Sequence, residues 1–174
     1  MQDVVLALLA KEPSHGYELR ARLLDALGPL GDALNAGQIY VTLGRLEKAG
    51  LVAWERAEGL PDRPDRKVYA LTAAGQQRVS EWLTVVDWPG LVPTEFQLKL
   101  VAAAAARLAD PIALIDAQRR ELLRRLRDAQ GAALKEDDDS PAALLLEGLV
   151  LRLQADVRWL EACERYWTTR RAGR

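Results

Sequence analysis

One face of a helix predicted at residues 36–49 carries side chains that can recognise nucleic-acid bases. Glutamine can pair with adenine, arginine with guanine, and a valine or threonine methyl group can contact the methyl group of thymine. A tyrosine at the edge of this face can donate its hydroxyl hydrogen to a phosphate oxygen. A solvated amphipathic helix is the alternative explanation, because polar helix faces are common. The candidate DNA-contacting residues of this face are Gln38, Tyr40, Val41, Thr42, Arg45 and Lys48.

A second cationic group follows this helix in sequence. Arg56, Arg63, Arg66 and Lys67 lie in or beside the loop "EGLPDRPD", in which prolines should make the chain project. Such a loop can reach phosphates or a narrow minor groove. Acidic residues are interspersed among these cations, so the group is not strongly positive. We therefore select Arg63, Arg66 and Lys67 as the candidate DNA contacts of the loop.

The elements that must position these residues follow a recognisable order. Helices are predicted over residues 3–10, from Ser14 to Gly28, and from just after Asn35 to Gly50, with Ser14 as the cap of the second. In the third helix Ile39, Leu43 and Leu46 recur at helical spacing and should face a core. Strands are predicted over 51–57 and 66–72, and Thr72 should cap a fourth helix. Three helices followed by a two-stranded hairpin predict a winged helix-turn-helix domain.

The rest of the chain is predicted to be entirely helical. "DWPGLVP" at 87–93 reads as a hinge, so we place the domain boundary between residues 87 and 88. Helices are predicted over 95–107, 111–135 and 141–169, with Asp110 and Ser140 as caps before prolines. The fold class is therefore mainly α, with a DNA-binding domain at 1–87 and a helical domain for dimerisation and effector binding at 88–174.

The last predicted helix has more apolar surface than a two-helix pair can cover. Large exposed apolar patches usually mark an interaction site, and a second copy of the chain is the simplest partner. The apolar residues that cover much of this helix are Leu144, Leu145, Leu146, Leu149, Val150, Leu151, Leu153, Val157, Trp159 and Leu160.

Composition excludes several other classes of protein. The formal net charge is −1, so binding to DNA would depend on a local cationic patch. One cysteine, Cys163, excludes an internal disulfide framework and favours the cytoplasm; one histidine, His15, argues against a histidine-rich metal site. We find no apolar run long enough for a membrane helix and no catalytic, phosphate-binding or metal-binding motif. No cofactor is expected, and an enzyme is the least supported class.

Several stretches together resemble the PadR family of bacterial transcriptional repressors. "HGYEL" at 15–19, "GQIYVTLGRLEKAGLV" at 37–52 and "RKVYALTAAGQQ" at 66–77 carry the N-terminal resemblance. "EFQLKLVAAAA" and "LQADVRWLEACE" resemble the longer-tailed branch of the family, which has a helical C-terminal domain. The resemblance implies a dimeric repressor that binds double-stranded DNA at a pseudo-palindromic operator, with Tyr40 on the phosphate backbone. A winged-helix module that binds proteins and not DNA is the alternative.

The resemblance also implies a dimer interface and an effector. In the family, the first and final helices build the dimer, which gives as candidates Val4, Val5, Leu8, Leu149, Leu153, Val157 and Leu160. A small aromatic or hydrophobic effector would bind a pocket between the two domains. Aromatic residues that could line it are Trp82, Trp88, Phe96 and Trp159, although core or interface anchoring is the alternative role for each.

Overall fold

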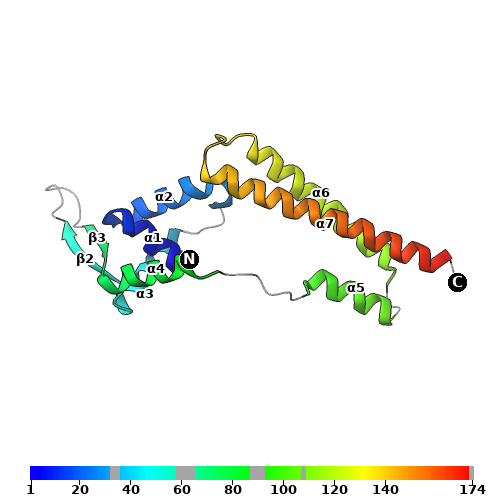
Figure 1. Ribbon diagram of the computed structural model, residues 1–174, viewed down its shortest axis with the longest axis horizontal. Helices are drawn as coiled ribbons and strands as arrows, with labels where there is room; N and C mark the ends of the chain where they lie inside the picture. Colours follow the sequence, from blue (N-terminus) through cyan, green and yellow to red (C-terminus); the bar gives the residue numbers. More distant parts are fainter. Residues whose placement is uncertain (32–35, 58–65, 87–92, 107–108, 173–174) are drawn as a thin grey trace. The chain divides into compact units, whose positions relative to one another are not determined.

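The computed structural model describes residues 1–31, 36–57, 66–86, 93–106 and 109–172, shown in Figure 1. The chain divides into two compact units, Met1–Trp88 and Pro89–Arg174. The predicted fold class is confirmed, since the chain is mainly helical with a small antiparallel sheet in the first unit. None of the helices in the described ranges is both long enough and apolar enough to cross a lipid bilayer.

The first unit alternates helices with short strands. Its elements are α1 (Gln2–Lys11), β1 (Ser14–His15), α2 (Gly16–Leu27), the 3₁₀ turn η1 (Gly28–Gly31), α3 (Ala36–Lys48), β2 (Val52–Ala57), β3 (Arg66–Leu71) and α4 (Ala73–Thr84). The strands pair antiparallel in the order β1-β3-β2. The predicted hairpin is thus present, but β1 was not predicted, because a two-residue strand carries no alternating pattern.

The start of α2 differs from the prediction. Ser14 lies in β1, where its hydroxyl donates to the carbonyl oxygen of Glu12 at 3.1 Å, and it does not cap α2. His15 occupies the cap position, and its backbone N–H donates to the Glu18 carboxylate at 3.0 Å. This bond foremost, together with a hydrogen bond from the Tyr17 hydroxyl and the nearby positive charge of Arg22, lowers the pKa of Glu18. The chain therefore enters α2 directly from the sheet.

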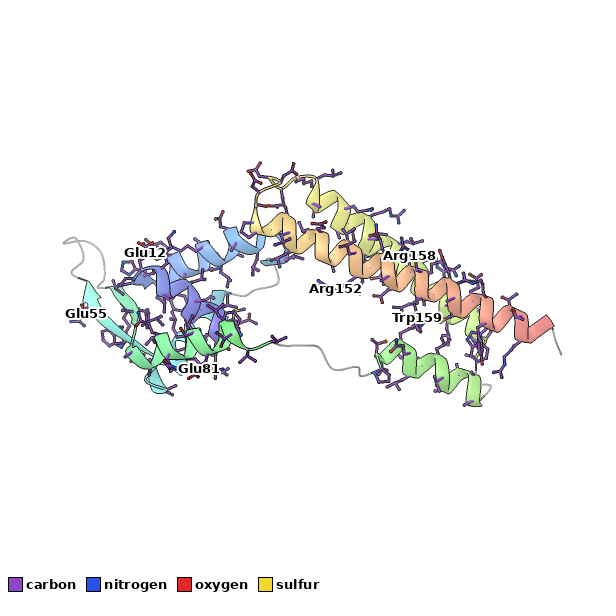
Figure 2. All side chains as sticks on the ribbon, viewed as in Figure 1. Glu12, Glu55, Glu81, Arg152, Arg158 and Trp159 are labelled. Atoms are coloured by element: carbon purple, nitrogen blue, oxygen red, sulfur yellow. The ribbon has the colours of Figure 1, made fainter. Side chains whose placement is uncertain are left out.

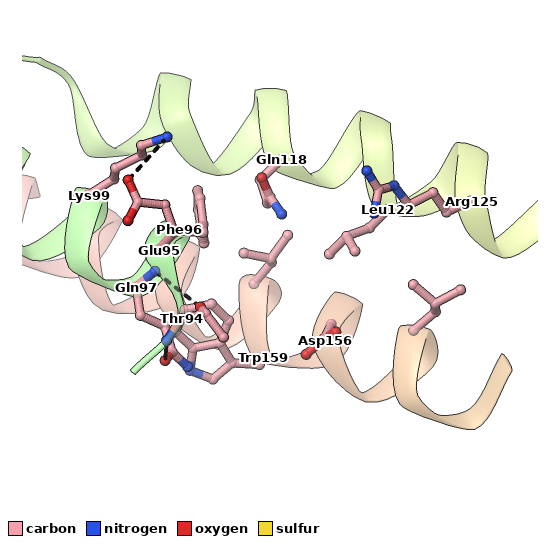
Figure 3. Close-up of a pocket in the computed structure, with 12 residues that line it drawn as sticks. Thr94, Glu95, Phe96, Gln97, Lys99, Gln118, Leu122, Arg125, Asp156 and Trp159 are labelled. Atoms are coloured by element: carbon pink, nitrogen blue, oxygen red, sulfur yellow. Dashed lines mark hydrogen bonds and ion pairs between the residues drawn. The ribbon is translucent and has the colours of Figure 1, made fainter. Parts of the chain in front are cut away.

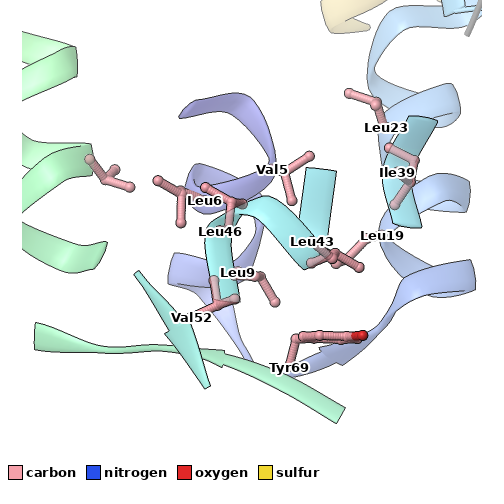
Figure 4. Packing of buried hydrophobic residues seen from close by; sticks show 11 residues of the cluster. Val5, Leu6, Leu9, Leu19, Leu23, Ile39, Leu43, Leu46, Val52 and Tyr69 are labelled. Atoms are coloured by element: carbon pink, nitrogen blue, oxygen red, sulfur yellow. The ribbon is translucent and has the colours of Figure 1, made fainter. Parts of the chain in front are cut away.

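The core of the first unit is assembled from every helix of that unit and two strands, as Figure 4 shows. The predicted inward residues Ile39, Leu43 and Leu46 of α3 are buried there and pack with α1, α2 and the sheet. Gly50 ends α3 with a φ of 69°, the left-handed conformation that glycine adopts most easily. Thr72 caps α4 as predicted, accepting a hydrogen bond from the Gly75 N–H at 3.1 Å. The core therefore packs against the side of α3 that carries Ile39, Leu43 and Leu46.

The second unit contains α5 (Glu95–Ala106), α6 (Pro111–Ala133) and α7 (Pro141–Ala172), and α6 and α7 run side by side (Figure 1). Thr94 and Gln97 form a capping box at the start of α5. Asp110 and Ser140 accept the predicted capping bonds at the starts of α6 and α7. The predicted hinge at 87–93 lies, except for its last residue, outside the described residues.

Part of the predicted dimer interface is instead core. Val5 is 0% exposed in the core of the first unit, and Leu160 and Leu153 are 0% and 8% exposed in the core of the second. A side chain already covered by its own chain cannot bury more area against another, so the prediction is wrong for these three residues. Each lies on the inner side of its helix. Because these helices carry apolar residues on several sides, the sequence does not indicate which side is buried in the core. The remaining candidates, Val4, Leu8, Leu149 and Val157, are partly buried.

Candidate nucleic-acid interface

The outward face of α3 keeps most of its predicted residues exposed. Tyr40 and Val41 are each 54% exposed, and the other members of the face are exposed as well: Gln38, Arg45 and Lys48. Thr42 is the exception, with 6% exposure, so its predicted role as a DNA contact is wrong. It lies three residues after Ile39 and therefore on the same side of the helix as the core positions.

The wing strands carry one predicted contact whose side chain the structure describes. Lys67 on β3 is exposed, and its ammonium nitrogen lies 3.8 Å from the ring centroid of Trp54 on β2, a cation–π contact. The Trp54 indole N–H donates to the Glu47 carboxylate of α3 at 2.6 Å. The Trp54–Glu47 hydrogen bond joins the wing to α3, whereas the Lys67–Trp54 contact joins the two strands of the wing. Arg63 lies outside the described residues, as does the side chain of Arg66.

A buried tyrosine sits behind this junction. Tyr69 of β3 is 8% exposed and is paired in register with Trp54 of β2 and Ser14 of β1. Burial raises the pKa of its hydroxyl, and the negative charge of Glu47 adds to the effect. Tyr69 therefore stays protonated and neutral beneath the exposed face.

Sequence reasoning missed the residues that join α2 to this surface. His15 Nδ1 donates to the backbone carbonyl oxygen of Lys67 at 3.1 Å, and its ring stacks on Tyr17 with centroids 5.8 Å apart. Gly16 packs directly against the ring of Tyr40. No periodicity signals the contacts of His15 with Lys67 and of Gly16 with Tyr40, since these join residues far apart in sequence.

The second unit contains a cavity of about 460 Å³ between α5, α6 and α7 (Figure 3). Phe96 and Trp159 meet edge to face on its wall, with ring centroids 6.1 Å apart and planes at 89°. Trp159 extends from α7 on the side that faces α5 (Figure 2). The cavity therefore combines two aromatic rings with charged and amide groups, among them Lys99, Gln118, Arg125 and Asp156.

Several residues that line this cavity take part in ion pairs along their own helices. Arg125 donates to the Glu121 carboxylate at 2.7 Å, and Arg124 binds both oxygens of the same group at 3.0 and 2.7 Å. These hydrogen bonds, that of Arg124 foremost, lower the pKa of Glu121 to about 2. On α5, Lys99 lies 3.6 Å from Glu95.

Two of the predicted effector-binding aromatics, Phe96 and Trp159, lie together in the described part of the second unit. Both residues line the cavity. Trp82 lies on α4 of the first unit and is 39% exposed, and its place in a pocket between the two domains stays a prediction. Trp88 lies outside the described residues. Within the described ranges, no three His, Cys, Asp or Glu side chains are placed to hold a metal ion.

A helix with an exposed polar face, tied to a two-stranded wing, defines a winged helix-turn-helix domain. Comparison with known families gives the more particular assignment. Residues 5–81 match the Transcriptional regulator PadR-like family. The first unit of this chain therefore carries a domain of the PadR-like family of transcriptional regulators.

Relatives match the chain over nearly its whole length. The Negative transcriptional regulator PadR of Bacillus subtilis (strain 168) is 27% identical over 173 residues, which cover 93% of this chain and 94% of that protein. The crystal structure of Bacillus subtilis PadR with operator DNA matches with a TM-score of 0.67 and 25% identity, covering 95% of this chain and 98% of that one. Its complex with p-coumaric acid matches with a TM-score of 0.69 and 26% identity, covering 96% and 98%.

Proposed function

We propose that this chain is a repressor that binds a pseudo-palindromic operator as a homodimer, through α3 and the wing of each subunit. The observation that carries the proposal is the exposed face of α3, which holds Tyr40, Arg45 and Lys48 beside the wing lysine Lys67. The Bacillus subtilis relative was crystallised with operator DNA, which supports the same role here. Two recognition helices about 34 Å apart would read successive major grooves.

The proposal gives each exposed residue a separate role. Gln38 and Arg45 read base edges in the major groove, and Val41 contacts a thymine methyl group. Tyr40 and Lys48 bind phosphates and fix the register of the helix on DNA. On the wing, Lys67, Arg63 and Arg66 bind phosphates or enter the minor groove.

The test is fluorescence anisotropy on labelled DNA from the region upstream of the chain's own gene. We expect Arg45→Ala to weaken binding by about 1–3 kcal/mol and to relax base preference at one position of each half-site. Tyr40→Phe should weaken binding to all sequences alike, since it removes only a phosphate contact. Lys135→Ala, which removes an exposed positive charge of the second unit, is the control. Absence of binding by the wild-type protein at low salt would favour the protein-interaction module.

Homodimer formation is supported by apolar residues that the second unit leaves exposed on α7. Leu144, Leu151 and Tyr166 are spaced about two turns and then about four turns apart, and they are 70%, 57% and 52% exposed. Side chains at such intervals share one side of a helix. Covering this apolar stripe with the same stripe of a second copy would form a twofold interface.

The double substitution Leu144→Glu and Leu151→Glu is expected to convert the dimer into monomers. Two carboxylates on the stripe would have to be desolvated without partners if the dimer formed. Light scattering coupled to size exclusion measures the mass. Leu134→Glu is the matched control, because Leu134 is 88% exposed and lies outside the stripe, just after the end of α6. A wild-type monomer, or a double variant that stays dimeric, would contradict the proposed interface.

We also propose that the cavity of the second unit binds a small aromatic or hydrophobic effector that releases the DNA. Its volume is in the range of small-molecule sites, and two aromatic rings form part of its wall. An effector acts only by binding the DNA-free conformation more tightly, so it must raise the measured Kd for DNA. We expect p-coumaric acid, the ligand of the relative's complex, to do so and to quench tryptophan fluorescence. Trp159→Phe should abolish the quenching; quenching that persists would place the ligand elsewhere.

A further inference from the structure

We propose that Gly16 positions the ring of Tyr40 for its contact with the DNA backbone, an inference that rests on the proposed function. Gly16 is the first residue of α2 and is buried. A Cβ atom built on it would lie 2.7 Å from Cε1 of Tyr40, 3.2 Å from its Cζ and 3.3 Å from its Cδ1. One edge of the tyrosine ring therefore lies directly against the backbone of Gly16.

The reason for glycine at this position is steric. Among the described glycines, Gly28 and Gly50 have a positive φ. Gly16 has no such φ, so its backbone conformation is one that residues with a side chain can also adopt. A Cβ contact of 2.7 Å is closer than folded proteins tolerate, so any side chain at position 16 would displace the ring. Tyr40 is 54% exposed, and its ring can move into solvent at little cost to the fold. Such a movement changes the location of the Tyr40 hydroxyl group.

The backbone around Gly16 is a rigid platform. The preceding residues Ser14 and His15 pair with Tyr69 and Val68 of β3, and the His15 N–H is held by Glu18 at 3.0 Å. A helix start fixed on both sides cannot retreat from an added methyl group. The strain of a substitution must therefore be relieved by Tyr40.

The same platform also holds the wing. His15, adjacent to Gly16, donates its Nδ1 hydrogen to the carbonyl oxygen of Lys67. The segment Ser14–Gly16 thus contacts the recognition-helix tyrosine on one side and the strand of the wing lysine on the other. This segment therefore sets the distance between Tyr40 and Lys67, the two side chains that the proposed function assigns to DNA phosphates.

A double-mutant cycle between Gly16→Ala and Tyr40→Ala tests the inference. Kd for operator DNA is measured by anisotropy, and Tm by circular dichroism. We expect Gly16→Ala to weaken DNA binding about 2- to 10-fold for each half-site, the value of one phosphate hydrogen bond, with Tm unchanged or higher. In the Tyr40→Ala background, the same substitution should have no further effect on Kd.

Gly131→Ala is the matched control, because it also adds a methyl group within a helix and meets nothing within 4 Å. It should leave Kd unchanged. If Gly16→Ala binds like wild type, or weakens binding equally with and without the tyrosine ring, the inference is overturned. If Gly16→Ala lowers Tm, removal of the Tyr40 ring must restore it; failure to do so would also overturn the inference. Failure of the wild-type protein to bind DNA would instead refute the proposed function.

Discussion

Raising the salt concentration from about 50 to about 200 mM is expected to weaken operator binding by about 10³- to 10⁵-fold. The expectation follows if the dimer neutralises roughly 6–10 phosphates, since each contact releases a condensed counterion. The net charge of −1 makes the test informative, because no excess of positive charge over the whole protein would produce this slope. The measurement is anisotropy at a series of salt concentrations, plotted as log Kd against log salt.

Single substitutions should show how much each residue contributes to the slope of log Kd against log salt. Lys67→Ala and Lys48→Ala should each lower the slope by about 1 per subunit, because each removes one phosphate contact. Val41→Ala should change affinity without changing the slope, since a thymine methyl contact releases no counterion. A slope near zero for the wild-type protein would contradict DNA binding through α3 and the wing.

Leu43→Ala is expected to destabilise the first unit by about 2–5 kcal/mol. Leu43 is 0% exposed on the inner side of α3, where it packs with α1, α2 and the sheet (Figure 4). The truncation removes buried apolar area and leaves a cavity that the surrounding elements cannot fill completely. A loss of this size is a large part of the total stability of a domain.

Urea unfolding followed by far-ultraviolet circular dichroism measures the loss. Leu83→Ala is the control: Leu83 of α4 is 68% exposed, so its truncation should change stability by no more than about 0.5 kcal/mol. Equal effects of the two substitutions would show that α3 is not anchored through Leu43. DNA affinity of Leu43→Ala under conditions where it is folded should be close to that of wild type, since the outward face is unaltered.

Local sequence pattern was enough to predict the main helices, the hairpin and the inward side of α3. Ile39, Leu43 and Leu46 could be placed because helical spacing depends only on residues a turn or two apart. The caps Thr72, Asp110 and Ser140 were predicted for the same reason, since a cap bonds to backbone groups two or three residues away. The left-handed Gly50 is likewise a local feature.

Tertiary packing sets how much of the circumference of each helix is buried. Sequence pattern placed Thr42 on the outward face, yet the folded chain leaves it only 6% exposed. The same cause removes Val5, Leu153 and Leu160 from the predicted interface. Neighbouring elements, which periodicity does not describe, set how far around a helix the core extends.

Contacts between distant segments could be seen only in the tertiary structure. The strand Ser14–His15 exists because β3 lies beside it, and Gly16 has its steric role because α2 begins against the ring of Tyr40. Trp54 reaches Glu47, and Phe96 meets Trp159, for the same reason. Local patterns record which way a side chain points along its own element, whereas the neighbour that it meets depends on the path of the whole chain.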